Sequence, residues 1–357
     1  MLIVVALLLV TLIGFVALGV DVGALYSAKA SAQEIADAAA LAGAFTFVSN
    51  PEDDQPETAE NYARGIAANN SIMGAAPDVD VTVDVAKRRV TVQVRTIQET
   101  HFAKALGRAT AEILATATAE ASEHSHGTTK ARPWFVSNTV FSTSPICTAR
   151  CNPAELLIDP SSGEVTDFAK TKFGSQFTLK PQDPKDALSP GQFFEIDLPG
   201  LGGGANGYEE GIVNGAPDYA PCQSTYSAMT GNKTGKTISG VERLLGSPPR
   251  YTWLAPGRYQ RQADGKIFDM AENLVVAPIW DVCSAADFCP GGKFKGGGTH
   301  ITLSMAGFSV IFVEGIAADD GVVARLVNVS SCGGWGASNG GDRGSSVLTI
   351  PVRLVRP

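Results

Sequence analysis

The first 45 residues, MLIVVALLLVTLIGFVALGVDVGALYSAKASAQEIADAAALAGAF (residues 1–45), decide how the rest of the chain can be arranged. Residues 1–20 carry no charge, and Thr11 is their single polar residue. At about 1.5 Å of rise per residue, such a run spans the ~30 Å hydrocarbon core of a bilayer. The sequence that follows favours helix and contains no proline before Pro51. We therefore predict one unbroken helix over residues 1–48, with residues 1–20 spanning a membrane.

A cleaved signal peptide is the alternative, although it would show a basic start and a small-residue cleavage motif. Small residues recur along the predicted helix at Gly19, Gly23, Ala28, Ala32 and Ala36. Because small residues at helical spacing let two helices approach closely, we predict that these positions pack against other helices. An ordinary alanine-rich helix would show the same composition.

The next segment, residues 49–121, reads as a small mixed module. Residues 57–69 favour a helix, and residues 79–85 and 90–94 place valine at every second position, as in a hairpin with one buried face. A short helix at 101–107 and a strand ending near residue 121 complete the module. Asp80 and Asp84 could suggest calcium, but on a strand they lie along a solvated face instead of converging like loop ligands.

Residues 122–133 are polar and punctuated, so we predict a linker. From residue 134 to 357 apolar strand patterns recur, and the stretch from about 147 to 289 reads as a long, loop-heavy insertion. The last strand pattern, around residues 346–355, contains Pro351, which predicts an edge strand of this β-rich domain. The predicted fold class is α+β: a long membrane or pilin-like helix, a small helix–hairpin–helix–strand module, then the β-rich domain.

Charge and cysteine content narrow the possible partners and the compartment. The net charge is −8 without a dense basic cluster, which argues against nucleic acid. The six cysteines all follow residue 146 and show no zinc-like Cys-x-x-Cys spacing, so we predict disulfides in an oxidising compartment; reduced thiols are the alternative. Fifteen pairings are possible. Two local bridges would leave Cys222 and Cys332 to pair, while cross-pairing between the two close pairs is equally open. The candidates are Cys147, Cys151, Cys222, Cys283, Cys289 and Cys332.

The string TGNKTGKT at residues 230–237 ends like a nucleotide-binding P-loop. Such a loop needs glycine five positions before Gly235, where this chain has Thr230, and no apolar strand precedes it. We therefore predict no nucleotide partner. No metal site, cofactor site or catalytic signature is predicted, because His124 and His126 lack a third donor at fixed spacing and His101 and His300 stand alone.

Several motifs together resemble the Tad (Flp) pilus-assembly proteins of TadE/TadG type. Near the N-terminus they are Asp21, Gly23 and Tyr26, followed by an alanine-rich run from Asp37 to Ala44 that ends the motif. Further along, Pro133-Trp134, GQFFEIDL at 191–198 and GNKTGKTISGVERLL at 231–245 are similar to motifs of some TadG-like proteins. The positions carried over in this half are Trp134, Gly231, Asn232, Gly235 and Gly240. Many TadG proteins instead carry a von Willebrand A-type metal motif, which is absent here.

The resemblance implies a membrane-anchored structural or minor-pilin-like protein of the Tad pilus, with its C-terminal domain outside the cytoplasm or on a surface filament. Its implied partners are other pilus subunits, contacted through the N-terminal helix, and membrane lipid. A surface adhesin on the same anchor and a secreted enzyme of unknown class are the alternatives, and we predict no enzymatic activity.

Overall fold

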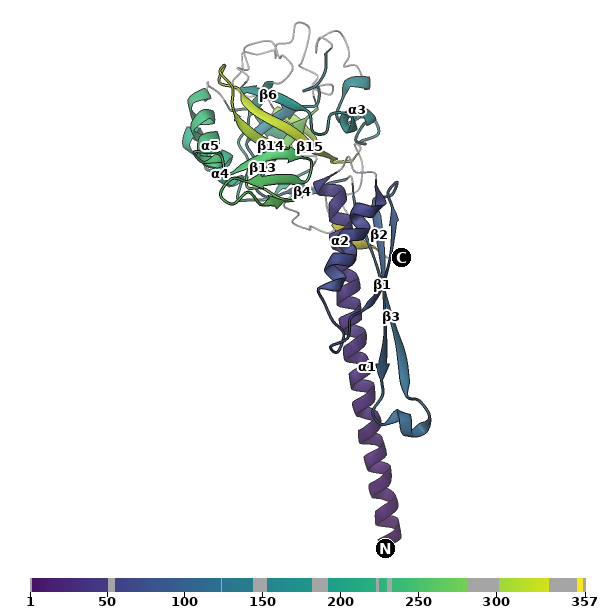
Figure 1. Ribbon diagram of the computed structural model, residues 1–357. Coiled ribbons are helices and arrows are strands. Elements are labelled where there is room, and N and C mark those ends of the chain that lie inside the picture. The colour runs from purple at the N-terminus through teal and green to yellow at the C-terminus, as the bar shows by residue number, and fades with distance from the viewer. Residues whose placement is uncertain are drawn as a thin grey trace. The chain divides into compact units, whose positions relative to one another are not determined.

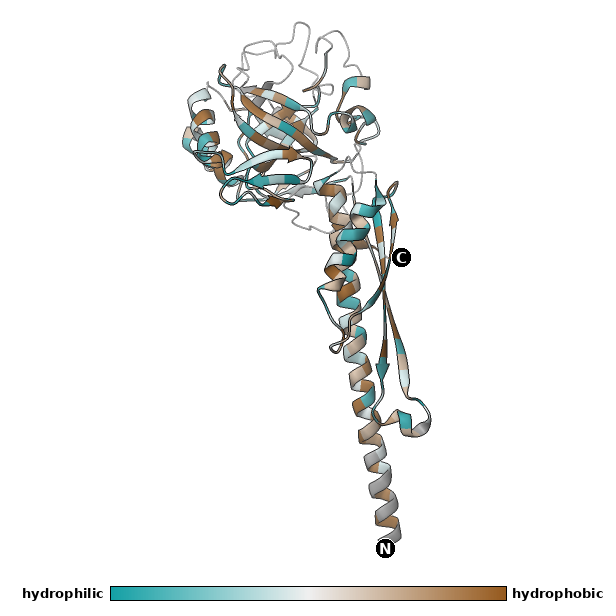
Figure 2. Ribbon diagram, viewed as in Figure 1, coloured by the Kyte–Doolittle hydropathy of each residue, from teal (hydrophilic) through white to brown (hydrophobic). Residues whose placement is uncertain are grey.

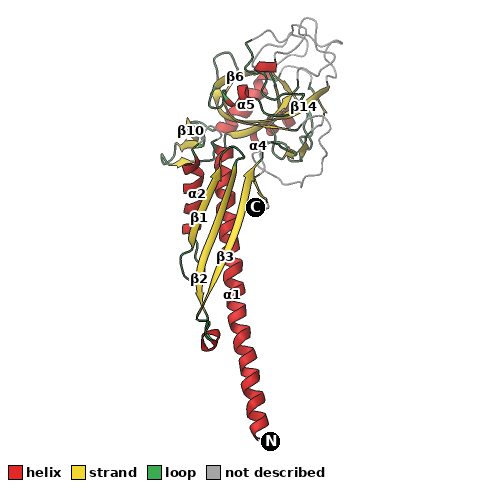
Figure 3. Ribbon diagram, turned by 90° about the vertical axis from the view of Figure 1, so that its right-hand side faces the viewer, coloured by secondary structure: helices red, strands yellow, loops and turns green. Residues whose placement is uncertain are grey.

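The computed structural model describes residues 2–50, 55–122, 124–143, 153–181, 192–222, 225–229, 233–281, 302–333 and 352–355. The chain forms two units, and each is described by itself. The N-terminal unit contains Met1–Phe47, Asp53–Ala121 and Val352–Pro357, and the C-terminal unit contains Val48–Glu52 and Ser122–Pro351. The expected α+β class, with a long N-terminal helix and a β-rich domain, is confirmed (Figures 1 and 3).

In the N-terminal unit, helix α1 (Leu2–Ser49) lies along an antiparallel sheet of order β1-β2-β3-β16, with helix α2 beside it (Figure 1). A 3-10 helix, η1 (Ala103–Leu106), joins β2 to β3. The alternation of apolar and polar residues along the strands can be followed in Figure 2. The valine face of β2 is buried, as the period-two pattern predicts. The other elements are α2 (Pro56–Ala68), β1 (Asp78–Asp84), β2 (Arg89–Glu99), β3 (Thr110–Ala121) and β16 (Val352–Val355).

Small side chains bring the helices and the sheet of this unit into close contact. The buried face of α1 consists largely of alanine, and a Cβ added at Gly43 would lie 2.9 Å from Val90 Cγ1 and 3.0 Å from the Ala59 carbonyl oxygen. Gly43 is therefore required where α1 meets both α2 and β2. Within the described residues, no helix is apolar enough over a sufficient length to cross a membrane.

The C-terminal strand corrects one prediction. Strand β16 pairs antiparallel with β3, from Val352 opposite Ala121 to Val355 opposite Thr118. It is an edge strand, but it completes the sheet of the N-terminal unit and not that of the β-rich unit. Alternation predicts a strand, whereas its pairing partner depends on contacts between residues more than 230 positions apart in the printed sequence.

In the C-terminal unit, a seven-stranded sheet of order β13-β5-β7-β6-β15-β14-β9 closes on itself through a further pairing of β13 with β14. Strands β6, β13, β14 and β15 are labelled in Figure 1. Its strands are β5 (Trp134–Ser137), β6 (Gln176–Pro181), β7 (Gln192–Glu195), β9 (Thr225–Ser227), β13 (Leu274–Trp280), β14 (Thr302–Ile316) and β15 (Val322–Ser331). The remaining elements are β4 (Gly127–Thr128), η2 (Pro153–Glu155), α3 (Asp167–Lys170), α4 (Gly204–Asn214), β8 (Ala220–Pro221), α5 (Thr234–Leu245), β10 (Tyr251–Ala255), β11 (Arg258–Arg261) and β12 (Ile267–Phe268).

Two predicted boundaries differ from this architecture. The predicted linker, 122–133, is packed into the C-terminal unit: β4 pairs with β8, Ser125 and Ala131 are buried, and the Arg132 amide donates to the Val276 carbonyl at 2.7 Å. The predicted insertion, 147–289, supplies β6 and β7, and each of these strands has a neighbouring strand on both sides in the closed sheet. The sequence does not reveal that these two segments belong to the folded unit, because they are polar or form short strands. The backbone hydrogen bonds that hold them come from distant elements.

Candidate functional site

The N-terminal part of α1 exposes apolar side chains that the unit itself does not cover. Leu8, Leu12 and Phe15 are 65%, 67% and 72% exposed, and the other large apolar side chains described between Val4 and Val22 are exposed too. We call residues 4–22 the apolar stalk. Contiguous exposed apolar surface of this kind is typical of a segment that contacts lipid or other proteins.

Asp21 fastens the base of the apolar stalk to the sheet. Its carboxylate accepts backbone hydrogen bonds from His101 at 2.8 Å, Phe102 at 2.9 Å and Ala103 at 2.6 Å, at the start of η1. Burial acts to raise the pKa of Asp21, but these three bonds outweigh it and leave the pKa below its ordinary value. A single ionised side chain thereby fixes the β2–β3 connection to α1.

The five predicted helix-packing positions separate into two groups. Ala28, Ala32 and Ala36 are fully buried inside the N-terminal unit, so they seat α1 on its own module and are unavailable to another chain. Gly19 and Gly23 are exposed, and a Cβ at either would meet nothing within 4 Å. The prediction of contacts with other helices is corrected for the alanines, because the sheet covers the face that carries them.

The other N-terminal motif residues also differ in their surroundings. Tyr26 is 75% exposed, so nothing within the unit requires its ring. Asp37 accepts a hydrogen bond from Gln33 Nε2 at 2.8 Å, one helical turn away, and the same nitrogen lies 3.3 Å from the Thr116 carbonyl oxygen of β3. Asp37 therefore supports the seating of α1, whereas Tyr26 and Gly23 face outward.

The near-P-loop string contributes to a buried polar cluster instead of a phosphate site. Residues 230–232, which include Gly231 and Asn232, lie outside the described residues. Lys233 Nζ donates to Glu195 Oε2 at 2.9 Å, and both side chains are almost fully buried. Burial raises the pKa of Glu195, and Lys233 opposes that rise. Lys236 Nζ instead forms an ion pair with Glu209 at 2.6 Å, so both lysines of the string are engaged by carboxylates.

Further members of the cluster come from the other motifs of this half. The Tyr208 hydroxyl on α4 lies 2.9 Å from Thr237 Oγ1 and accepts from Trp134 Nε1 at 3.2 Å. Sequence reasoning identified Trp134 but missed Glu195 and Tyr208 as its neighbours. The signal was present in the motif GQFFEIDL, whose single glutamate falls on a strand with an apolar character.

The two described glycines of this motif differ in their role. A Cβ at Gly240 would lie 3.0 Å from three atoms of Ile212, so this glycine lets α5 pack closely on α4. A Cβ at Gly235 would meet nothing within 4 Å. Close approach explains Gly240, and nothing in the structure explains Gly235.

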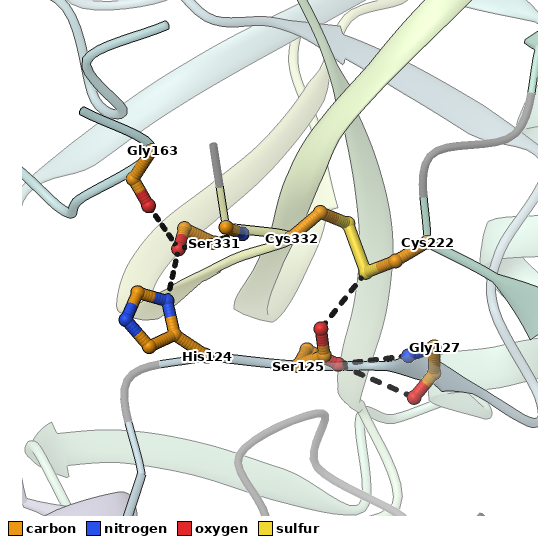
Figure 4. Close-up of a disulfide and its surroundings, with 8 residues drawn as sticks. His124, Ser125, Gly127, Gly163, Cys222, Ser331 and Cys332 are labelled. Carbon is orange, nitrogen blue, oxygen red and sulfur yellow. Dashed lines mark hydrogen bonds between the residues drawn. A yellow bond between two sulfur atoms is a disulfide. The ribbon is translucent and has the colours of Figure 1, made fainter. Parts of the chain in front are cut away.

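A disulfide joins Cys222 to Cys332 and closes a separation of 110 residues (Figure 4). It ties the segment after β8 to the end of β15. This is the pairing that remains if the other four cysteines form two local bridges, but Cys147, Cys151, Cys283 and Cys289 lie outside the described residues.

A histidine and a serine meet beside this disulfide. His124 Nδ1 lies 2.9 Å from Ser331 Oγ, and that hydroxyl donates to the Gly163 carbonyl at 2.5 Å (Figure 4). Since a hydroxyl has one proton and a carbonyl only accepts, His124 must supply the proton of the bond to Ser331. In a catalytic pair the serine hydroxyl would donate its proton to the histidine, so the direction of this hydrogen bond is the reverse of the one that a nucleophile and its general base need. Among the described residues, no group of three metal-ligating side chains occurs.

Comparison with known proteins gives a family match at the N-terminus. Residues 1–45 match the family model described as "Putative Flp pilus-assembly TadE/G-like". This confirms the resemblance carried by the residues around Asp21, Tyr26 and Asp37. No curated protein and no solved structure matches the chain significantly. The resemblance of the motif residues in the C-terminal unit stays a prediction.

Proposed function

We propose, from the match of residues 1–45 to the Flp pilus-assembly family model, that the protein is a membrane-anchored subunit of the pilus or of its assembly apparatus. Its C-terminal unit would lie outside the cytoplasm and carry surface loops. The family is described by pilus assembly and not by a catalytic activity, so a structural role is the function that follows.

The apolar stalk carries this proposal. The stalk is uncharged up to Asp21, and its described large apolar side chains are exposed on the isolated chain, so they need a bilayer or other helices around them. Gly19 and Gly23 leave room on the stalk for a neighbouring helix to approach closely. Asp21 links the stalk to the sheet of the N-terminal unit, so a force on the stalk would be transmitted to a folded unit.

A matched pair of substitutions tests the role of the stalk. Leu12 on α1 and Ile97 on β2 are both 67% exposed, so Leu12→Lys and Ile97→Lys add the same charge at equal exposure. A lysine at the centre of a membrane helix costs about 2.5–3.5 kcal/mol. We expect Leu12→Lys to lose membrane fractionation and filament incorporation, measured by immunoblotting and by immunogold labelling of the C-terminal unit. Ile97→Lys should keep both.

The outcomes separate the alternatives. Equal behaviour of the two variants would refute a specific role for the stalk. Wild-type protein that stays in the membrane and never labels a filament would favour an anchored adhesin or assembly factor over a filament subunit. Protease added to intact spheroplasts should degrade the C-terminal unit, and full protection of that unit would contradict the extracytoplasmic location.

A further inference from the structure

A pocket in the C-terminal unit is rich in positive charge and has no part in the proposed pilus function. Its volume is about 450 Å³, within the ~300–1,000 Å³ range of small-molecule sites. We call it the cationic pocket. Four basic side chains line it together with a single carboxylate; they are Lys130, Arg132, Arg243, Arg250 and Glu272.

Two of the arginines have structural partners. Arg250 forms an ion pair with Glu272 inside the pocket, and its Nη2 lies 3.4 Å from the Leu244 carbonyl oxygen at the end of α5. Arg243 forms ion pairs with Glu209 at 3.1 Å and Glu210 at 2.8 Å. Their charges are balanced by carboxylates, so the surplus positive charge of the pocket belongs to the remaining two cations.

Arg132 provides the buried part of that surplus. Its side chain is 7% exposed, and within the described residues its Nε has no hydrogen-bond partner and no nearby charge shifts the pKa of the guanidinium. The contact that the described residues give its Nη1 is the Lys130 carbonyl oxygen, at 3.5 Å. Burial lowers the pKa of Arg132 to about 10, which still leaves it charged at neutral pH. A buried charge without a counter-ion is costly, and a bound anion would offset that cost.

The remaining walls are apolar apart from Asn214, whose amide nitrogen donates to Glu210 Oε2 at 3.1 Å, and they indicate what kind of anion fits. Val213 and Leu244 come from the ends of α4 and α5, Met270 from the segment before β13, and Leu274 and Val276 from β13 itself. The Arg132 amide donates to the Val276 carbonyl, which fixes the arginine against this wall. A planar guanidinium matches a carboxylate with two parallel hydrogen bonds. We propose that the cationic pocket binds a carboxylic acid with an apolar body, its carboxylate at Arg132 and Lys130.

Calorimetric titration of the detergent-solubilised full chain tests this site, with protein-free micelles as the blank. The probes are 4-phenylbutyrate and its neutral amide, which share one shape. A hydrogen bond to a charged group contributes about 1.5–3 kcal/mol, so we expect the amide to bind at least about tenfold more weakly. Arg132→Gln and Lys130→Glu should each weaken binding of the carboxylate by a similar factor. Lys170→Ala, an exposed lysine outside the pocket, should leave it unchanged.

Lys130 is exposed, so Lys130→Glu keeps the test decisive even if Arg132→Gln does not fold. One-site binding of 4-phenylbutyrate that both the amide and Lys130→Glu weaken supports the proposal. No binding of the carboxylate, equal binding of the amide, or an unchanged affinity in Lys130→Glu would each overturn it. Inorganic phosphate could also bind this site, with an affinity that Arg132→Gln and Lys130→Glu reduce. Tighter binding of phosphate than of 4-phenylbutyrate would overturn the proposal, since the ligand would then be a phosphate.

Discussion

Removing Lys233 from the buried cluster should have a large and pH-dependent effect on stability. Lys233 Nζ lies 2.9 Å from Glu195 Oε2, with side chains 9% and 4% exposed, and 6.0 Å from the centre of the Tyr208 ring. Lys233→Met leaves the Glu195 carboxylate buried without a cation. Breaking a buried ion pair in this way costs about 3–5 kcal/mol. For a unit of this size such a loss lowers the melting temperature by about 6–20 °C.

The stability loss in Lys233→Met should depend on pH in a direction that follows from the pKa of Glu195. In Lys233→Met, burial raises the pKa of Glu195 further above its ordinary value of 4.5, since the opposing cation is gone. A group whose folded-state pKa is raised stabilises the fold below its unfolded pKa and loses that contribution as pH rises through the folded pKa. The variant should therefore be less destabilised relative to wild type near pH 4.5 than near about pH 8.

Denaturant titrations at both pH values, followed by tryptophan fluorescence, measure these differences. Replacing both partners, Lys233→Met with Glu195→Leu, removes the unpaired charge and should recover most of the lost stability. Lys236→Met is the matched control, because Lys236 is 40% exposed and its ion pair is partly solvated, so its effect should be much smaller. A loss below about 1 kcal/mol in Lys233→Met, or the same loss at both pH values, would refute the reasoning.

Three further predictions follow from the contacts described above. Replacing both Cys222 and Cys332 by serine should reduce the free energy of unfolding by about 4–5 kcal/mol, because the bridge closes a separation of 110 residues; a loss under about 1 kcal/mol in denaturant titrations would contradict the loop-closure argument. Asp21→Asn should speed amide hydrogen exchange at Phe102. Since the pKa of Asp21 is lowered, wild-type protection there should fall as pH drops through that pKa, whereas the variant should show no such step; equal profiles would refute the contact. ATP or GTP should leave the melting temperature unchanged in wild type and in Lys236→Ala, although a bound nucleotide at a hundredfold excess over Kd would add about 2.7 kcal/mol; a rise confined to wild type would restore the P-loop interpretation.

Local patterns in the sequence predict much of the N-terminal unit. The helix of α1, the hairpin of β1 and β2 and the turn before β3 could be predicted because each depends on periodicity within about a dozen residues. The motif around Asp21 also marked a residue whose carboxylate accepts three backbone hydrogen bonds. Its partners, the backbone amides at 101–103, could not be predicted, because a hydrogen bond across 80 residues leaves no periodic signal.

The C-terminal unit was harder to predict from the sequence, because more of its structure depends on tertiary contacts. Polar composition predicted a linker at residues 122–133, yet this segment is held in the C-terminal unit by hydrogen bonds to β8 and β13. The strand pattern near the C-terminus was correct as a pattern, but β16 joins the sheet of the other unit. In both cases the backbone groups are satisfied by partners far away in the chain, and composition does not name those partners.

By itself, the sequence determined that residues 1–20 are apolar, that the strands alternate and that Gly235-Lys236-Thr237 lacks the first glycine of a P-loop. It could not distinguish Lys233 from Lys236, which stand three residues apart in one motif. Only the tertiary structure placed Lys233 beside a buried carboxylate 38 residues away and left Lys236 in a partly solvated pair. The physical reason is that burial and charge pairing are properties of the surroundings of a side chain, and those surroundings are assembled from distant segments when the chain folds.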